Sequence, residues 1–255
     1  MAIASLSTDA SHLANALILA QAAMAAYGDT TALVNHGFTE MQTFAHEDTH
    51  TSGLVTCDEA NVILAFRGTQ RLPNWMTSAN VRLLAAFGGN VHQGFAHAWA
   101  MVRVPVTALL DRCHTPSRRL WITGHSLGGA LATLSAEDFH GEGRAVQQVV
   151  TFGAPRVGDT VFAAKYAIPT IRFVNYQDPV PWVPPHLIHV GQEWHFLPDG
   201  RLVQRMPRWL QVLEHALALA FQGNWRTALA DQLRQGVENH SMTTYLTRLT
   251  KAATT

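Results

Sequence analysis

Ten consecutive residues, LWITGHSLGG at 120–129, decide how this chain is interpreted. The first four are apolar or β-branched, which is typical of a short buried strand. Two glycines, Gly124 and Gly128, then flank Ser126 and remove Cβ atoms where the backbone must turn sharply. Apolar residues continue at helical spacing through residue 139. The pattern predicts a strand, a tight turn and a helix, the G-x-S-x-G context of a nucleophilic serine.

The segments around this stretch alternate between short apolar runs and helical patterns. We expect strands at 53–57, 61–66, 146–153 and 170–175, helices at 9–27, 159–167, 207–221 and 224–236, and an antiparallel extension at 186–204. Strands that alternate with helices imply right-handed crossovers and a mostly parallel sheet. No repeat or Gly/Ser linker divides the chain, so we predict a single domain over residues 1–255.

Composition excludes several classes of protein. The 255 residues contain 18 Lys plus Arg and 18 Asp plus Glu, a formal net charge of zero. A nucleic-acid binder would carry a basic surplus, so we expect no nucleic-acid partner. The longest apolar run, 13–27, is interrupted by Asn15 and Gln21 and falls short of the ~20 residues that a transmembrane helix needs.

Targeting and redox signals in the sequence are weak. The first basic residue is Arg67, so the charged start of a signal peptide is missing and we identify no clear export signal. Cys57 and Cys113 allow either one bridge or two free thiols, and both alternatives stay open.

A second short motif competes with the serine. His46-Glu47-Asp48-Thr49-His50 matches the H-E-x-x-H zinc-protease pattern, which needs both histidines on one face of a helix. The segment 39–53 is polar, lacks a helical apolar period and leads directly into a hairpin. We therefore interpret the two histidines as solvated loop residues, and we expect neither a metal nor another cofactor.

A nucleophilic serine needs a base and an acid, and in this type of fold they follow it in the order Ser, acid, His. Asp178 comes three residues after the strand expected at 170–175, where sheet sites gather, so we assign it as the acid. The other aspartates fit caps, turns or helix surfaces: Asp138, Asp159, Asp199 and Asp231.

Five histidines follow this acid: His186, His189, His195, His215 and His240. We expect His189 and His195 in strands and His215 within a helix. His240 follows the two late helices and precedes a short terminal helix, in a loop position suited to a catalytic base. We choose His240, with His186 as the reserve.

Two backbone groups are candidates for the oxyanion hole. One is the N–H of Leu127, the residue after the nucleophile. The second should come from the loop after the strand at 61–66, where Gly68 lets the backbone turn inward and Thr69 offers an N–H and a hydroxyl.

Together these residues resemble the class 3 lipase family, the α/β-hydrolases typified by fungal triacylglycerol lipases. The matching motifs occur in family order over residues 10–250. They are Phe66-Arg67-Gly68-Thr69, Asn74-Trp75, Val91-His92-Gln93-Gly94-Phe95, Gly124-His125-Ser126-Leu127-Gly128-Gly129, Thr151-Phe152-Gly153-Ala154-Pro155-Arg156-Val157-Gly158, Asp178-Pro179-Val180-Pro181 with Pro184-Pro185, and His240 with Tyr245.

The resemblance implies an α/β-hydrolase fold, with helices on both faces of a mostly parallel sheet and a lid over about 70–89. It implies ester hydrolysis by the triad Ser126, Asp178 and His240, with Thr69 and Leu127 as the oxyanion hole. The apolar lid residues are Leu72, Trp75, Met76, Leu83, Leu84 and Phe87. We expect an amphipathic flap that meets lipid, the alternative being a core helix packed on the sheet.

The chain departs from the family in two places. Family lids often carry an acid shortly after the Asn-Trp pair, whereas residues 76–79 contain none. Fungal members are secreted and disulfide-bonded, whereas this chain has two cysteines and no clear leader, so a secreted and a cytoplasmic location both stay open.

We expect a monomeric serine carboxylic-ester hydrolase, a triacylglycerol lipase that touches lipid–water interfaces transiently and forms an acyl-enzyme intermediate. The alternatives within the family are a phospholipase A1 and a feruloyl-type esterase. The alternative from another class is a catalytically silent, hydrolase-like binding protein.

Overall fold

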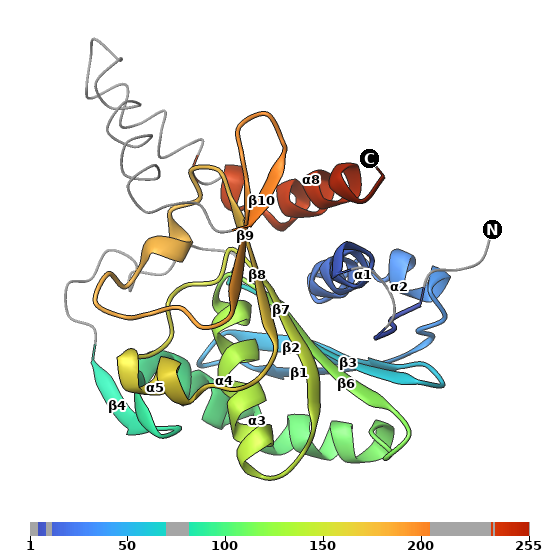
Figure 1. Cartoon of the computed structure of the whole chain (residues 1–255). Helices are drawn as coiled ribbons and strands as arrows, with labels where there is room; N and C mark the ends of the chain where they lie inside the picture. Colours follow the sequence, from blue (N-terminus) through green and yellow to red (C-terminus); the bar gives the residue numbers. More distant parts are fainter. Residues whose placement is uncertain (1–4, 9–11, 70–81, 205–235, 237, 255) are drawn as a thin grey trace.

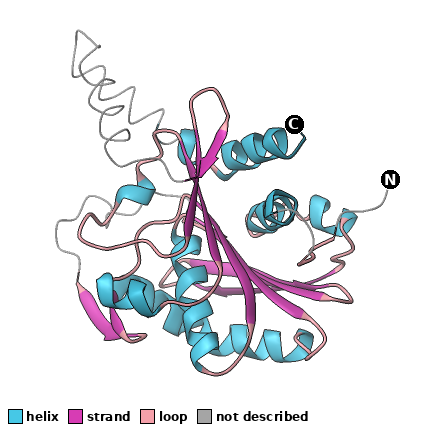
Figure 2. Cartoon of the chain, viewed as in Figure 1, coloured by secondary structure: helices cyan, strands magenta, loops and turns pink. Residues whose placement is uncertain are grey.

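A computed structural model describes residues 5–8, 12–69, 82–204, 236 and 238–254. Its framework is a twisted eight-stranded sheet in the order β1-β2-β3-β6-β7-β8-β9-β10 (Figures 1 and 2). The strands are β1 (Glu40–His46), β2 (Thr51–Cys57), β3 (Asn61–Phe66), β6 (Arg119–His125), β7 (Val146–Phe152), β8 (Thr170–Asn175), β9 (Gln192–Phe196) and β10 (Leu202–Gln204). From β3 to β9 all neighbours are parallel, and the outer pairs are antiparallel.

Helices cover both faces of this sheet, as expected (Figure 1). On one face, α3 and α4 bury a core that includes Trp99 and Phe139. On the other face, α1 packs against α8 over a second core that includes Phe152 and Tyr245. The helices are α1 (His12–Ala25), α2 (Thr31–Asn35), α3 (Gln93–Cys113), α4 (Leu127–Gly141), α5 (Thr160–Lys165), the 3₁₀ turn η2 (Val180–Trp182) and α8 (Met242–Thr254).

The predicted strands at 53–57, 61–66, 146–153 and 170–175 are confirmed within one or two residues at each end, as is the helix at 159–167. The helix predicted at 9–27 is confirmed from His12, the first described residue after 8, to Ala25. The two helices expected at 207–221 and 224–236 lie almost wholly outside the described residues. α3 was not predicted, although its buried stripe has helical spacing: Phe95, Trp99, Val102, Val106 and Leu110.

We expected the segment 39–53 to be a loop. It instead forms most of an antiparallel hairpin made by β1 and β2. Sequence patterning misses β1 because it is an edge strand whose only buried side chain is Phe44. His46 ends β1, and His50 lies in the turn with φ 49°. The two histidines of the H-E-x-x-H pattern therefore do not share a helix face.

The extension at 186–204 is antiparallel only in part. β9 pairs parallel with β8, and only β10, after the expected turn at Asp199 and Gly200, runs antiparallel. Residues 176–191 form the crossover that a parallel pair requires. That crossover starts at the carboxyl end of β8 and contains Asp178.

Among the described residues, no helix is both long and apolar enough to span a bilayer. A small hairpin of β4 (Leu83–Ala86) and β5 (Gly89–His92) precedes α3. This hairpin was not predicted, because β4 lies in the segment that we interpreted as a lid and its strands have the minimum length of about four residues from which strands are recognised.

Candidate active site

Ser126 sits at a strained turn between β6 and α4. Its φ is 57° and its ψ is −128°, a conformation that costs energy in a residue with a Cβ atom. The flanking glycines make the turn possible: a Cβ on Gly124 would lie 2.2 Å from the carbonyl oxygen of Gly128, and one on Gly128 would lie 2.3 Å from that of Phe66. The Ser126 N–H donates to the carbonyl of Phe152 on β7 at 2.9 Å, which holds the turn against the sheet.

The structure brings Ser126, His240 and Asp178 into one hydrogen-bonded line. The Oγ of Ser126 lies 2.8 Å from Nε2 of His240. The other ring nitrogen, Nδ1, lies 3.0 Å from Oδ1 and 2.9 Å from Oδ2 of Asp178. A carboxylate only accepts, so Nδ1 carries the proton and Nε2 is free to accept the serine proton. All three side chains are buried.

Asp178 is held by three donors. Besides His240, the backbone N–H of Val180 donates to Oδ1 at 2.9 Å and the Tyr245 hydroxyl donates to Oδ2 at 2.6 Å. Burial raises the pKa of Tyr245 well above its usual range, and the charge of Asp178 adds to the shift. The phenol therefore remains a neutral donor, and the orientation of the carboxylate is defined on both oxygens.

The backbone around His240 is anchored from β8. Residues 238–240 are helical, where we expected a loop, and Ser241 separates them from α8. Asn175 donates its side-chain amide to the carbonyl of Asn239 at 2.8 Å. Gly153 has φ 57°, and a Cβ there would come within 2.7 Å of Oδ2 of Asp178 and 3.0 Å of Nδ1 of His240. Only glycine fits beside this pair.

The candidate oxyanion residues are the residue after Ser126 and a residue in the loop after β3. Leu127 opens α4, so its N–H is at the positive end of the helix. Gly68 packs tightly against the serine: a Cβ on Gly68 would be 2.9 Å from Cβ of Ser126. The hydroxyl of Thr69, the next residue, is buried and has no hydrogen-bond partner in the described part of the chain. An unpartnered buried donor, one residue after a glycine that packs against the serine, is suited to an oxygen that develops negative charge there.

The other candidate histidines lie elsewhere. We expected His189 in a strand, but it lies before β9. Its Nε2 bonds to the carbonyl oxygen of Pro181 at 2.6 Å. His195 is in β9, as expected, 3.6 Å from Glu193. The reserve candidate, His186, lies in a turn before β9, and His215 is outside the described residues.

The lid prediction is only partly within the described residues. Leu72, Trp75 and Met76 lie outside them. Leu83 and Leu84 project from β4 with 44% and 42% of their surface exposed. Phe87 lies in the turn between β4 and β5 and packs, partly buried, against the core under α3 and α4. The described part of the segment is therefore a hairpin, not the core helix of the alternative.

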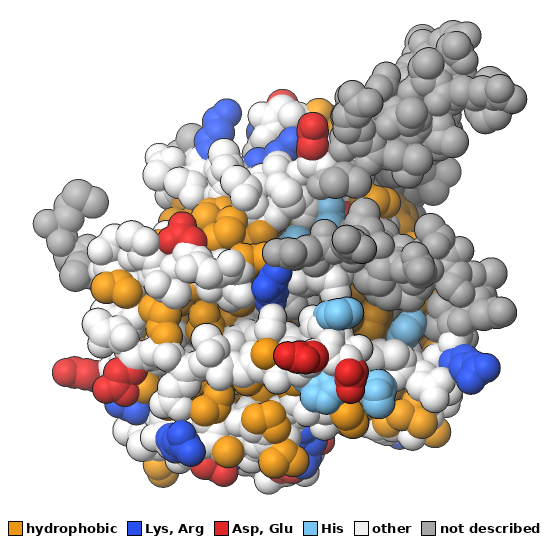
Figure 3. All heavy atoms as spheres, turned by 180° about the vertical axis from the view of Figure 1, so that it is seen from behind, with side chains coloured by type: hydrophobic (Ala, Val, Ile, Leu, Met, Phe, Trp, Pro, Cys, Tyr) orange, Lys and Arg blue, Asp and Glu red, His pale blue; other side chains and the backbone are white. Residues whose placement is uncertain are grey.

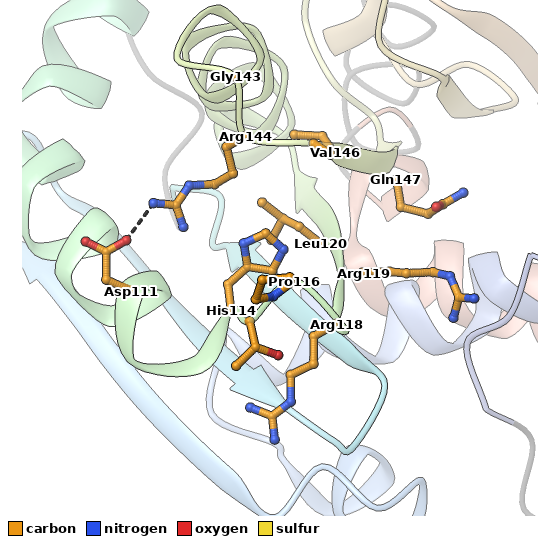
Figure 4. A pocket seen from close by; sticks show the side chains of 12 residues that line it. Asp111, His114, Pro116, Arg118, Arg119, Leu120, Gly143, Arg144, Val146 and Gln147 are labelled. Carbon is orange, nitrogen blue, oxygen red and sulfur yellow. Dashed lines mark hydrogen bonds and ion pairs between the residues drawn. The ribbon is translucent and has the colours of Figure 1, made fainter.

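A surface hollow of about 540 Å³ lies at the amino ends of β6 and β7, whereas Ser126 follows the carboxyl end of β6. It is lined by residues that begin β6 and β7, including Arg119 and Val146, and by His114, Arg118 and Arg144 (Figure 4). The guanidinium groups point away from one another, and that of Arg144 pairs with Asp111. The hollow is thus separate from Ser126.

Two further residues lie beside the triad, Tyr27 and His125, and neither was among the predicted site residues. The ring of His125 lies 4.6 Å from that of His240, centre to centre, and Tyr27 bonds to it at 2.7 Å. The position of His125 inside the serine motif was a signal that we did not use. Tyr27 carries no local signal, because it lies 98 positions away from His125.

Comparison with known proteins places the chain among lipases. The family model for lipase (class 3) matches residues 63–188. The secreted mono- and diacylglycerol lipase A of Penicillium cyclopium is 32% identical over 195 residues, which cover 71% of this chain and 62% of that protein. A lipase of Rhizomucor miehei is 35% identical over 151 residues, covering 53% of this chain and 42% of that protein. The chain thus spans less than two thirds of the length of either relative.

Solved structures agree with this placement. Lipase II from Rhizopus niveus superposes with a TM-score of 0.64 and 28% identity, over 72% of this chain and 80% of that one. The sheet order, the helices on both faces and the serine at the turn after β6 confirm the α/β-hydrolase fold expected from the sequence. On these grounds the chain belongs to the class 3 lipase family.

Proposed function

We propose that this chain is a serine carboxylic-ester hydrolase that forms an acyl-enzyme intermediate. The observation that carries the proposal is the 2.8 Å contact between Oγ of Ser126 and an imidazole nitrogen whose other nitrogen faces Asp178. A serine hydroxyl is a weak nucleophile until a positioned base removes its proton. The hydrogen bonds of His240 to Ser126 and to Asp178 support its role as that base.

In the proposed reaction, Ser126 attacks the ester carbonyl while Nε2 of His240 takes its proton. Asp178 stabilises the imidazolium that forms and keeps the ring oriented. His240 then donates the proton to the leaving alcohol, and the acyl group stays on Ser126. A water molecule, deprotonated by His240, releases the acid and restores the serine.

We assign the oxyanion hole to the N–H of Leu127 and to Thr69. Charge moves onto the carbonyl oxygen during attack, and a donor aimed at that oxygen contributes about 10²–10³ in turnover. The unpartnered buried hydroxyl of Thr69 supports this assignment, as does its place next to Gly68.

As substrates we propose acylglycerols, with triacylglycerol first, met transiently at a lipid–water interface by a single-domain monomer. The names of the chain's relatives support this class, and the phospholipases A1 among them make phospholipids the second candidate. The exposed pair Leu83 and Leu84 supports contact with lipid. On the face drawn in Figure 3, hydrophobic side chains lie in groups among polar ones.

The test compares the native chain with Ser126→Ala on p-nitrophenyl esters of increasing acyl length. The matched control is Ser135→Ala, another buried serine, whose hydroxyl bonds within α4 to the carbonyl of Ala132. We expect activity to vanish only in Ser126→Ala. Activity that survives this change would overturn the site, and no activity of the native chain on any ester would favour a binding protein.

The substrate class needs a second measurement. We would follow acid release from emulsified triacylglycerol, from phosphatidylcholine vesicles and from a feruloyl ester, and record the rate through the solubility limit of a short triacylglycerol. A jump at emulsion formation supports interfacial action, whereas a smooth curve removes that part of the proposal.

A further inference from the structure

A second histidine, His125, occupies the site without a part in the proposed reaction. It directly precedes Ser126, is buried, and packs beside His240 with an angle of 34° between the rings. Both of its nitrogens are engaged. Nδ1 lies 2.7 Å from the hydroxyl of Tyr27, and Nε2 lies 2.5 Å from the backbone carbonyl oxygen of His240.

These two contacts determine which nitrogen of His125 carries the proton. A carbonyl oxygen only accepts, so Nε2 must donate to His240. Burial lowers the pKa of His125 well below its usual value, and the neighbouring ring of His240 adds to the shift. The ring is therefore neutral, Nδ1 has no proton, and the hydroxyl of Tyr27 must donate to it.

The hydroxyl of Tyr27 also contacts the loop after β3 that contains Gly68 and Thr69, which we call the oxyanion loop. Its oxygen accepts the backbone N–H of Gly68 at 3.1 Å, and the guanidinium of Arg67 lies over the phenol ring at 5.3 Å. Burial raises the pKa of Tyr27 to about 12, so the phenol keeps its proton. The hydrogen bonds thus run in one direction, from Gly68 through Tyr27 and His125 to the carbonyl of His240.

We propose that Tyr27 and His125 are positioning residues of the ester hydrolase, which tie the oxyanion loop to the backbone of the catalytic base. This inference rests on the proposed function. One end of the path precedes Thr69, and the other end is His240 itself, so one set of bonds sets the distance between the oxyanion donors and the base. Their hydrogen bonds end on the backbone of Gly68 and of His240, so both residues act through position.

The neutral state of His125 also suits the reaction. His240 becomes positively charged when it takes the serine proton. A charged ring 4.6 Å away would oppose that step, whereas a neutral ring that donates only to the backbone carbonyl does not.

The first test is Tyr27→Phe, which removes only the hydroxyl. We expect kcat on p-nitrophenyl butyrate to fall by about tenfold to 10²-fold with KM changed less than about threefold, because the base and the oxyanion donors lose their alignment. The matched control is Tyr166→Phe: Tyr166 is also partly buried and also bonds to another side chain, Thr170. Equal kcat in both variants would overturn the proposal.

The second test separates the two nitrogens of His125. Glutamine can place an amide N–H near the position of Nε2, whereas asparagine reaches only the position of Nδ1. We expect His125→Gln to keep more of the native kcat than His125→Asn, with melting temperatures compared by circular dichroism. The reverse order, at similar melting temperatures, would contradict the assigned direction.

A third measurement needs no activity. Nitrogen-15 NMR of histidine-labelled protein, assigned with His125→Gln, should show a protonated Nε2 and an unprotonated Nδ1 on His125. The opposite tautomer would overturn the inference.

The variant Ser126→Ala distinguishes failure of the proposed function from failure of the positioning role. If Ser126→Ala remains active, the proposed function fails. If it is inactive and the kcat of Tyr27→Phe equals that of the native chain, only the positioning role fails.

Discussion

The two sides of the His240 imidazole differ in charge, although both are buried and fully hydrogen-bonded. On one side stands the carboxylate of Asp178, with donors on both oxygens. On the other side stands the neutral ring of His125, which packs beside the His240 ring and bonds to its backbone carbonyl, with the neutral phenol of Tyr27 behind it. In the proposed reaction, the charge thus lies where an imidazolium has to be stabilised, and the neutral groups lie where only position has to be kept.

The largest expected effect on kcat comes from Asp178→Asn, on the charged side of His240. The amide keeps the size of the side chain but loses the charge, so the tautomer and the imidazolium of His240 lose their support. We expect kcat to fall by about 10⁴ while the protein stays folded. The control is Asp199→Asn in an exposed turn, which should leave kcat unchanged. Near-native turnover of Asp178→Asn would mean that the acid lies elsewhere.

A smaller loss should follow from moving the oxyanion loop. In Gly68→Ala the new Cβ would lie 2.6 Å from the Tyr27 hydroxyl and 2.9 Å from Cβ of Ser126, so the loop must shift. We expect kcat/KM to drop by about 10²–10³, the contribution of one oxyanion donor. Gly141→Ala, where a Cβ meets nothing within 4 Å, is the control. Equal rates in both variants would show that this loop does not contribute to catalysis.

Tyr245→Phe removes one donor from the charged side. A hydrogen bond to a charged group contributes about 1.5–3 kcal/mol, so we expect roughly a tenfold or greater loss of kcat and a lower melting temperature. The same change also leaves the N–H of Asn175 without its partner. Steady-state kinetics and thermal melts measure both effects. An unaltered kcat at a reduced melting temperature would restrict Tyr245 to a structural role.

The smallest expected effect is the contribution of His125 to the pH dependence of the stability of the fold. The pKa of His125 is lowered on folding, so below its unfolded value of about 6.5 the unfolded chain binds a proton that the native chain does not. Stability is therefore lost as pH falls from about 6.5 toward the lowered pKa. The groups that face His125 are Tyr27, Arg67 behind it, His240 and Tyr245.

Urea unfolding of the native chain and of His125→Gln between about pH 7 and 5 measures this contribution. We expect a shallower loss of stability in the variant. His92 and His114 also have lowered pKa values and remain in both proteins, so their contribution cancels in the comparison. Identical slopes would show that His125 binds its proton equally in both states.

Local patterns were sufficient where neighbours in sequence are also neighbours in structure. The turn at Ser126 needs two glycines within four positions, and they can be read directly from the sequence. The place of Asp178 followed from the end of β8, because parallel strands bring their carboxyl ends to one edge. The edge strand β1 and the parallel direction of β9 were wrongly predicted, because one is polar on most positions and the other depends on the path of the crossover.

The sequence by itself therefore determined the alternation of strands and helices, the strained serine and the order of serine, acid and histidine. Tertiary structure alone decided that His240 meets Ser126 across 114 positions and that Tyr27 reaches His125 across 98. The physical reason is that hydrogen bonds in this site connect the end of α1, the loop after β3, the turn after β6 and the residues before α8. No local periodicity encodes such contacts, because they exist only once the sheet has brought those ends together.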